Sequence, residues 1–482
     1  MNKRSIHIII GMCIMLFFWF LPFTFPEVTE VGMKVIGVFL GTLYLWITID
    51  ILTASLVSVA MVVFTGYADV EEMLKAYMNT MLVQMFFLMI LARALAQQEV
   101  TKYIARFFLT LKINRGRPWV LAYIVGLGCF LMGSFVDWLT PILLFWPILY
   151  SIFDQLGYSN DDAYPRIMTV LVVAATALGF PVPPYMNLAF ILINNYAALT
   201  KDFPGGAVTV PSGSYLICSL IIGLILLTVF VLFAKFVFRP DVSNMKRFDP
   251  DTVNQTDPLP PMTTQQRILS GGMVLVILAF LLPTIFRSVP LLAAFSHYVK
   301  VIPLIAVAIF CVIRTNNKPI IDIDGALSAG FPWPLVAMVA TALILAGALT
   351  NPSTGVAAFL NYLLSPIFSD MSVTVFTIVL VCIAYVLTNF CNSFVISIIL
   401  SPIVATYCTA TGANAIPILM LLFYSVLGSA LVTPSASPFA ALIHGNDRLK
   451  ITDKYGMTFV LTVVQQIVIL GVGIPLSRWL IG

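Results

Sequence analysis

Apolar runs fill most of the chain and alternate with short polar loops. A helix needs about 20 apolar residues to cross the hydrocarbon core of a membrane. The uninterrupted runs come close to that length, and we expect each of them to form one transmembrane helix. They cover residues 5–25, 33–48, 50–66, 78–97, 212–236, 267–286, 299–315, 327–349 and 456–480.

Four longer runs carry polar or proline-rich interruptions. A backbone break inside hydrocarbon is costly, so it persists only where protein or a water-filled cavity surrounds it. The runs 118–153 and 370–408 contain short polar stretches, which predict two re-entrant hairpins. The runs 164–198 and 414–443 contain "GFPVPPYMN" and "VTPSASP". Their prolines remove amide donors, which predicts two broken helices.

The order of these elements repeats in the two halves of the chain, and three sequence matches keep nearly the same spacing. Constant spacing over several matches indicates an internal duplication. An odd number of crossings is expected in each half, so the two copies are predicted to be inverted in the membrane. The matches pair "LARALAQ" at Leu91–Gln97 with "LAGALTN" at Leu345–Asn351, "SFVDWLTPILLFWPI" at Ser134–Ile148 with "NFCNSFVISIILSPI" at Asn389–Ile403, and Pro184 with Pro438.

These observations predict an all-α integral membrane protein with about 11 transmembrane helices. Residues 1–32 hold the first transmembrane helix and 33–238 the first repeat. Residues 239–266, which are polar and rich in proline, form a cytoplasmic linker, and 267–482 form the second repeat.

Basic residues gather in a few loops. If Lys3 and Arg4 lie in the cytoplasm, the loops 98–117, 239–247 and 448–454 lie there too. This is the bias that the positive-inside rule expects. We therefore expect a multi-pass protein of the cell membrane with a cytoplasmic N-terminus and an external C-terminus.

Composition agrees with a membrane protein and excludes several functions. The chain is 60% hydrophobic and 10% charged, whereas soluble domains contain about 25% charged residues. The net charge of +4 lies in loops and does not indicate nucleic acid. The sequence lacks HExxH, GxxxxGK[ST] and clustered cysteine or histidine. Enzymatic activity, ATP-driven transport and a resident cofactor are therefore not expected.

Inverted repeats whose broken helices meet near the membrane midplane are a transporter design. Helix N-termini at such breaks attract anions, and exposed carbonyls coordinate cations. The alternative is that the polar residues only join helices by hydrogen bonds. The candidates for substrate binding are Ser134, Thr140, Asn187, Asn389, Asn392, Ser393, Thr433, Ser435 and Ser437; those for ion coupling are Asp137, Asn392 and Ser393, with Asp137 and Asn392 as possible sodium ligands.

The chain resembles the divalent anion/sodium symporters, which transport dicarboxylates, citrate and sulfate. The stretch from Met33 to Leu95 is similar to the amino-terminal region of that family. "VPPYMNLA" at Val182–Ala189 and "TPSASPFAALIHG" at Thr433–Gly445 stand in the places of its two broken-helix motifs. The resemblance implies a homodimer in which a transport domain of hairpins and broken helices moves like an elevator against a scaffold. It also implies sodium coupling.

The first hairpin tip departs from the family pattern. The family has Ser-Asn-Thr at both tips, and the second tip here reads Cys391-Asn392-Ser393, a close variant. The first tip instead carries Asp137. This carboxyl group could carry a proton, bind a cation, or hold the tip together by pairing with a buried donor. Arg93, at one end of its span, is interpreted as a side chain that snorkels to the membrane surface.

The sequence thus predicts a secondary active symporter of a small anion, a di- or tricarboxylate, that uses sodium or protons. The alternative is a cation/proton antiporter of the same superfamily that uses Asp137. A channel is a further class, which the two separate hairpins disfavour. The sequence does not identify the substrate or the coupling ion.

Overall fold

The computed structural model describes residues 3–78, 80–159, 161–201, 206–256, 258–286, 289–295, 298, 301–315, 317–323, 325, 333–359, 362, 371–390, 393–434 and 436–481. Asn187 is described by its backbone alone. Asn392 and Ser435, two of the predicted site residues, lie outside the described residues.

Helices make up nearly all regular structure in the described part of the first half. They are α1 (Lys3–Phe17), α2 (Glu30–Thr48), α3 (Ile51–Phe64), α4 (Val70–Tyr77), α5 (Thr80–Gln97), α6 (Val100–Leu109), α7 (Pro118–Phe135), α8 (Thr140–Gln155), α9 (Ala163–Gly179), α10 (Asn187–Leu199) and α11 (Ser212–Phe233), with short helical turns at Lys112–Asn114 and Ala234–Phe238.

The linker and the second half are helical as well, apart from one short antiparallel pair of strands, β1 (Arg314–Thr315) and β2 (Lys318–Pro319). The helices are α12 (Pro250–Thr256), α13 (Thr264–Ile285), α14 (Pro290–Phe295), α15 (Ile302–Val312), α17 (Trp333–Thr350), α19 (Val373–Thr388), α20 (Ser393–Thr411), α21 (Ala415–Gly428), α22 (Pro438–His444), α23 (Ile451–Val468) and α24 (Ile474–Ile481), with short turns at Asn244–Arg247 and Ile469–Gly473.

Among the described residues, five helices are long and apolar enough to cross a membrane, or six if a pair bent by 44° within 70–97 is counted as one span. The other apolar helices are shorter. One is α1, which ends at Phe17, earlier than the predicted span 5–25, before Pro22 and Pro26. The five are Glu30–Thr48, Pro118–Phe135, Ser212–Phe238, Ser393–Thr411 and Ile451–Ile481.

Polar side chains fix where the first helices begin. The Thr29 hydroxyl accepts a hydrogen bond from the backbone N–H of Gly32 and starts α2. The Asp50 carboxylate accepts one from Thr53 at 2.7 Å and starts α3. Such caps satisfy backbone donors that the helix itself leaves unpaired. The boundary at Asp50 therefore separates the two apolar runs 33–48 and 50–66 into two helices.

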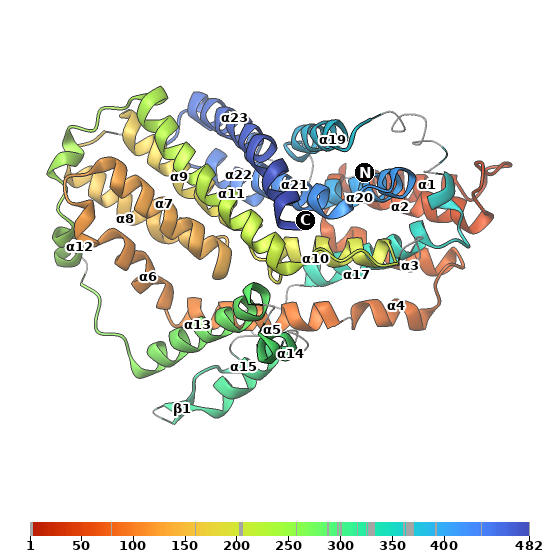
Figure 1. The fold of residues 1–482 in the computed structure, drawn as a ribbon, viewed down its shortest axis with the longest axis horizontal. Coiled ribbons are helices and arrows are strands. Elements are labelled where there is room, and N and C mark those ends of the chain that lie inside the picture. The colour runs from red at the N-terminus through yellow and green to blue at the C-terminus, as the bar shows by residue number, and fades with distance from the viewer. Residues whose placement is uncertain are drawn as a thin grey trace.

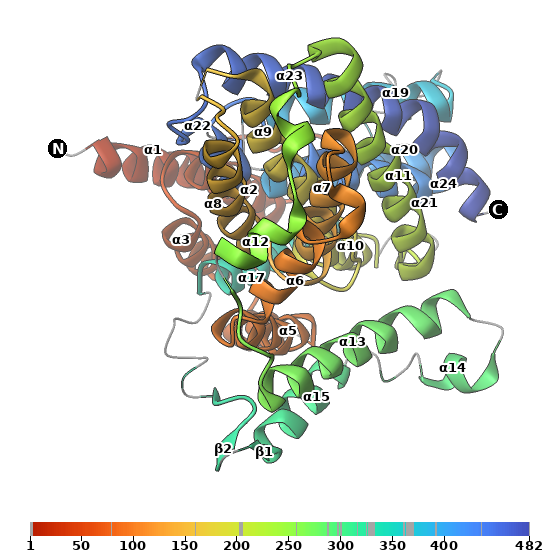
Figure 2. The same cartoon turned by 90° about the vertical axis from the view of Figure 1, so that its left-hand side faces the viewer.

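The helices pack in three groups (Figure 1). The first contains α1–α4 with α17, and the second, larger group contains α7–α9 and α11 with α19–α24. The third contains α5, α13 and α15, and Figure 2 shows α13–α15 set apart from the main body below α5. Helix α10 contacts α5, α17, α20 and α21 and so connects the groups.

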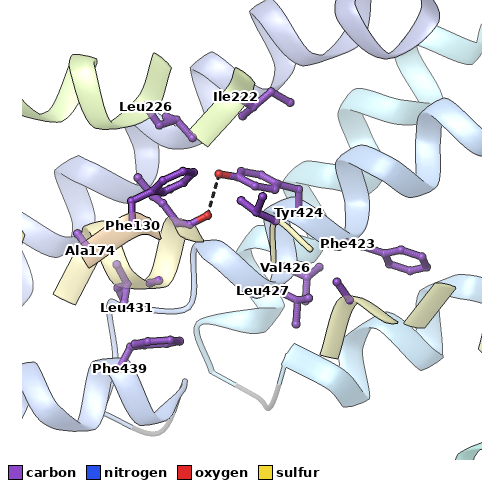
Figure 3. Close-up of a cluster of buried hydrophobic side chains, with 14 of the residues drawn as sticks. Phe130, Ala174, Ile222, Leu226, Phe423, Tyr424, Val426, Leu427, Leu431 and Phe439 are labelled. Atoms are coloured by element: carbon purple, nitrogen blue, oxygen red, sulfur yellow. Dashed lines mark hydrogen bonds between the residues drawn. The ribbon is translucent and has the colours of Figure 1, made fainter. Parts of the chain in front are cut away.

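The two halves of the chain share one core. Phe130 of α7 lies beside Tyr424 of α21, and the Tyr424 hydroxyl donates a hydrogen bond of 3.1 Å to the Leu178 carbonyl of α9 (Figure 3). This contact brings together the ends of α9 and α21, where the two predicted broken helices are interrupted.

The linker packs against the helices of the first half. Met245, Phe248 and Val253 are buried. The backbone N–H of Gly116 donates to the Phe248 carbonyl at 3.1 Å, and the Arg115 guanidinium pairs with Asp249 at 2.8 Å. The polar sequence of 239–266 therefore includes anchored segments that cover the ends of α6–α8.

Candidate functional site

The first predicted hairpin turns between α7 and α8, and Asp137 organises the turn. Its Oδ2 accepts hydrogen bonds from the backbone N–H groups of Leu139 and Thr140, at 3.3 and 3.1 Å, and from the Thr140 hydroxyl at 2.9 Å. The carboxylate thus caps the N-terminus of α8, where backbone donors lack helical partners. Asp137 and Thr140 therefore have a structural role that the sequence left open.

Ser134 joins this hairpin to the first broken helix. The Ser134 hydroxyl lies 2.8 Å from the Phe130 carbonyl and 3.0 Å from the Gly179 carbonyl at the end of α9. The two helices approach closely at this point, because a Cβ atom on Gly179 would lie only 2.1 Å from the Phe130 carbonyl oxygen. Ser134 is fully buried.

The second predicted hairpin turns between α19 and α20 and uses neutral groups. The hydroxyls of Thr388 and Ser393 share a hydrogen bond of 2.7 Å, and Thr388 also donates to the Val426 carbonyl at 3.1 Å. Asn389 donates to the Tyr385 carbonyl at 2.8 Å and accepts from the backbone N–H of Val432 at 3.0 Å. Thr433 donates its hydroxyl proton to the Asn389 carbonyl.

Ser134 and Asn389 correspond in the predicted duplication, and the structure gives them matching bonds. Each side chain bonds the carbonyl four residues earlier in its own helix. Each also bonds the interruption of the following broken helix, at Gly179 in one half and at Val432 in the other. Ser134 donates its bond to a carbonyl and Asn389 accepts its bond from a backbone N–H, so two unlike side chains connect hairpin and broken helix in the two halves.

The four interruptions meet around one cavity of about 530 Å³. The first hairpin contributes residues 136–139, and the second hairpin contributes Ser393. The broken helices contribute residues on both sides of their breaks, and α5 contributes one face. The lining residues are Leu88, Met89, Ala92, Arg93, Ala96, Val136, Asp137, Trp138, Leu139, Phe180, Met186, Leu188, Ser393, Leu427, Ala436, Ser437, Pro438 and Phe439.

Helix N-termini face this cavity from both halves. Its wall includes Leu139 just before α8, Leu188 at the start of α10 and Ser393 at the start of α20. The aligned peptide dipoles give such ends a partial positive charge. In α8 the protein supplies its own anion, Asp137. The arrangement favours a negatively charged group in the cavity.

The predicted site residues divide into three sets. Asp137, Ser393 and Ser437 line the cavity. Ser437 donates to the Ala430 carbonyl and caps α22 through the N–H of Ala440. Ser134, Thr140, Asn389 and Thr433 hold the interruptions together from behind the wall, by the bonds given above. The side chain of Asn187, together with Asn392 and Ser435, lies outside the described residues.

Arg93, which the sequence analysis interprets as a side chain that snorkels to the membrane surface, also lines this cavity. It is half-buried and lies in the cavity wall on one face of α5, with Met89 and Ala96. Hydropathy gives the depth of a residue in the membrane but not the direction in which its helix face points. The signal that sequence reasoning could have used is a cation within an otherwise apolar span.

Aromatic side chains of the wall were also missed. The Trp138 and Phe439 rings are 5.6 Å apart, and the Phe180 and Phe439 rings are 5.6 Å apart, both edge to face. Each comes from a different interruption. In the described part of the chain, no group of three histidine, cysteine or acidic residues lies together as metal ligands. A sodium ion here would need hydroxyl and carbonyl oxygens.

A family model described as the sodium:sulfate symporter transmembrane region matches residues 2–482. Among solved structures, that of the YdaH transporter from Alcanivorax borkumensis, described as having an unusual topology, is similar with a TM-score of 0.51. The two sequences are 13% identical, and the match covers 84% of this chain and 88% of that chain. Similarity at that identity concerns the fold. No curated protein sequence matches the chain.

Proposed function

This chain belongs to the sodium:sulfate symporter family, a family of multi-pass membrane transporters rather than enzymes, and on that premise we propose that it is a symporter of a di- or tricarboxylate. Uptake is coupled to sodium or protons. The transport domain contains the two hairpins and the two broken helices, and the cavity between them and α5 holds the substrate.

The convergence of the four interruptions on one cavity supports this proposal most directly. Residues far apart in the chain, such as Asp137, Ser393 and Ser437, line the same space. Helix N-termini and Arg93 give that space a positive character suited to an anion. A site made from both halves is the arrangement in which relative movement of two domains alternates access.

The bonds of Asp137 favour symport over the alternative of cation/proton antiport. All three hydrogen bonds to its Oδ2 come from Leu139 and Thr140, within its own hairpin. A carboxylate that caps a helix start has a structural role that is independent of ion coupling. In this proposal the coupling ion binds at the second tip, where Asn392 and Ser393 supply oxygen ligands.

The proposal includes a cytoplasmic N-terminus and an external C-terminus, and ion pairs between loops support the part of this topology that places residues 154–161 and 448–450 on one side. Arg448 pairs with Asp154 at 3.1 Å and Lys450 with Asp161 at 2.6 Å. The two loops therefore lie at the same end of the molecule, as the distribution of basic residues requires if both face the cytoplasm. The proposal also includes a homodimer held together by the scaffold helices.

Uptake into liposomes tests the function. Purified protein is reconstituted, and labelled succinate or citrate is offered with an inward sodium gradient, an inward proton gradient, or neither. Symport predicts accumulation that depends on one of the gradients. Sodium efflux driven by an imposed pH gradient, without carboxylate uptake, would instead establish the antiporter.

A further inference from the structure

We infer, on the basis of the proposed function, that the substrate is a carboxylate that carries an aromatic or similarly bulky apolar body. Arg93 binds its carboxylate, and Trp138, Phe180 and Phe439 contact its body. The inference rests on the chemistry of the cavity wall.

The wall is apolar over most of its extent. Of the 18 lining residues that the structure describes, only Arg93, Asp137, Ser393 and Ser437 carry charged or hydroxyl side chains. Asp137 holds its own hairpin tip, and the Ser437 hydroxyl donates to the Ala430 carbonyl. The described wall therefore offers few side-chain donors to replace the water that a compact dianion such as sulfate would lose.

The size of the cavity also exceeds the needs of a compact anion. Its volume of about 530 Å³ falls within the range of about 300–1,000 Å³ that is typical of pockets for larger organic ligands. Such pockets combine mostly apolar and aromatic walls with a few placed polar groups, which is the composition found here.

The three aromatic rings form a continuous surface across different interruptions. Phe439, after the second break, contacts both Trp138 of the first hairpin tip and Phe180 at the first break. Phe439 is 4% exposed, whereas Trp138 and Phe180 keep part of their surface open. An aryl group of the substrate can pack against these rings edge to face or offset.

Arg93 supplies the charge. Its guanidinium group can bind a carboxylate through two parallel hydrogen bonds. It comes from α5, outside the hairpins and broken helices, whereas the aromatic rings come from within them. A substrate with a carboxylate at one end and an apolar body at the other therefore contacts both sides of the interface at which movement is proposed.

Succinate and 2-benzylsuccinate make a matched pair for the test, because they differ by one benzyl group. Both anions are measured as competitors of labelled succinate uptake and by thermal stabilisation of the purified protein. We expect benzylsuccinate to act at concentrations lower by about tenfold or more, since its ring is removed from water in the cavity. Stabilisation by benzylsuccinate alone supports the inference as well.

Variants assign the two ends of the substrate. Trp138→Leu and Phe439→Leu should weaken benzylsuccinate more than succinate and so bring the ratio of the two half-inhibitory concentrations towards one. Trp479→Leu, at a side chain that is 76% exposed, is the matched control.

Arg93→Gln should raise the half-inhibitory concentrations of both anions about tenfold or more and leave their ratio unchanged, with Arg93→Lys in between. Arg267→Gln on the exposed part of α13 is its control.

The outcomes distinguish a failure of this inference from a failure of the proposed symporter function. If succinate is transported and benzylsuccinate competes equally or worse, the inference is wrong and the symporter remains. If the aromatic variants change both anions equally, the rings support the fold and do not contact the substrate. If neither anion is transported or stabilises the protein under sodium or proton gradients, the proposed function fails together with the inference.

Discussion

The two hairpin tips stabilise their turns with different side-chain chemistry. The first tip caps helix α8 with a carboxylate, Asp137, whereas the second joins its helices through the hydroxyls of Thr388 and Ser393. The sequence Thr388–Ser393 contains no acidic residue. The positive end of α8 therefore already has an anion, and the start of α20 does not. An anionic substrate should consequently depend more on the second tip.

The two broken helices differ in how tightly their ends are packed, and this gives the largest expected effect. A Cβ atom on Gly179 would meet the Phe130 backbone carbonyl at 2.1 Å, while one on Gly428 would meet the movable amide end of Gln465 at 2.9 Å. We expect Gly179→Ala to destabilise the protein by about 3 kcal/mol. Gly428→Ala should remain within about 1 kcal/mol of the wild type.

Thermal unfolding of both variants in the same detergent measures this difference. Gly271→Ala, at a position with open space around it, controls for the general effect of alanine in a helix. Equal melting temperatures for the Gly179 and Gly428 variants would show that the two breaks are packed alike.

Loss of the carboxylate cap should have the next largest effect. Asp137→Ala removes three hydrogen bonds and leaves the first donors of α8 unpaired, so we expect a loss of about 2 kcal/mol. Ser393→Ala removes one hydroxyl partner of Thr388 and should cost about 1 kcal/mol. The reverse order is expected for uptake, because Ser393 lines the cavity and lies at the tip proposed to bind the coupling ion. Melting temperatures and half-saturating succinate concentrations report the two effects separately.

Asp137→Asn sharpens this comparison, since its amide oxygen still accepts hydrogen bonds. Stability close to the wild type, with a pH profile of uptake that does not change, supports a capping role. A variant that folds normally but transports without a proton gradient would return Asp137 to the coupling mechanism and favour the antiporter.

Ser134 and Asn389 make corresponding bonds. Removing either side chain should lower the stability by a similar amount, which is smaller than the loss expected for Asp137→Ala. Asn389→Ala leaves the N–H of Val432 without its acceptor, and Ser134→Ala removes one donor to Gly179. We expect about 1 kcal/mol for each. Thr228→Ala on α11, whose hydroxyl bonds only within its own helix, is a control. An Asn389 variant with normal stability but much weaker substrate binding would place Asn389 in direct contact with the substrate.

Hydropathy and interruptions were sufficient to predict most helices. The runs 33–48 and 50–66 appear as α2 and α3, and the break predicted around Pro184 separates α9 from α10. These features depend on local composition, proline chemistry and the cost of polar backbone in hydrocarbon. They can therefore be predicted without knowledge of tertiary contacts.

The composition of the cavity wall could not be predicted in the same way. Arg93 and Phe439 are far apart in the sequence and line the same cavity because separate groups of helices pack together. The bonds of Asp137 depend on the turn geometry that follows α7. The anchoring of the linker through Phe248 depends on contacts with the preceding helices. Each of these needs the three-dimensional arrangement.

The far ends of the two hairpins give the smallest expected effect. Near the end of α8, Arg448 forms two hydrogen bonds with the Asp154 carboxylate at 3.1 Å each, whereas at the start of α19 Arg478 donates to the neutral hydroxyl of Thr374 at 2.7 Å. Exposed ion pairs contribute less than about 1 kcal/mol. We expect Arg448→Gln to lower the melting temperature only slightly at low salt, and the difference should shrink as salt screens the pair.

Acid should weaken the ion pairs near the end of α8 and leave the neutral contact at the start of α19 unchanged. The hydrogen bond from Lys450, followed by its charge, holds the pKa of Asp161 below its ordinary value of 3.8. Because the folded pKa is the lower one, the stabilising contribution is complete above the ordinary value and is lost as the pH falls through the lowered value. The small difference in melting temperature between the wild type and Asp161→Asn should therefore disappear in strong acid. Thr374→Val, which removes the neutral acceptor, should show no such pH dependence, and a matching acid response in both variants would mean that charge does not distinguish the two hairpins.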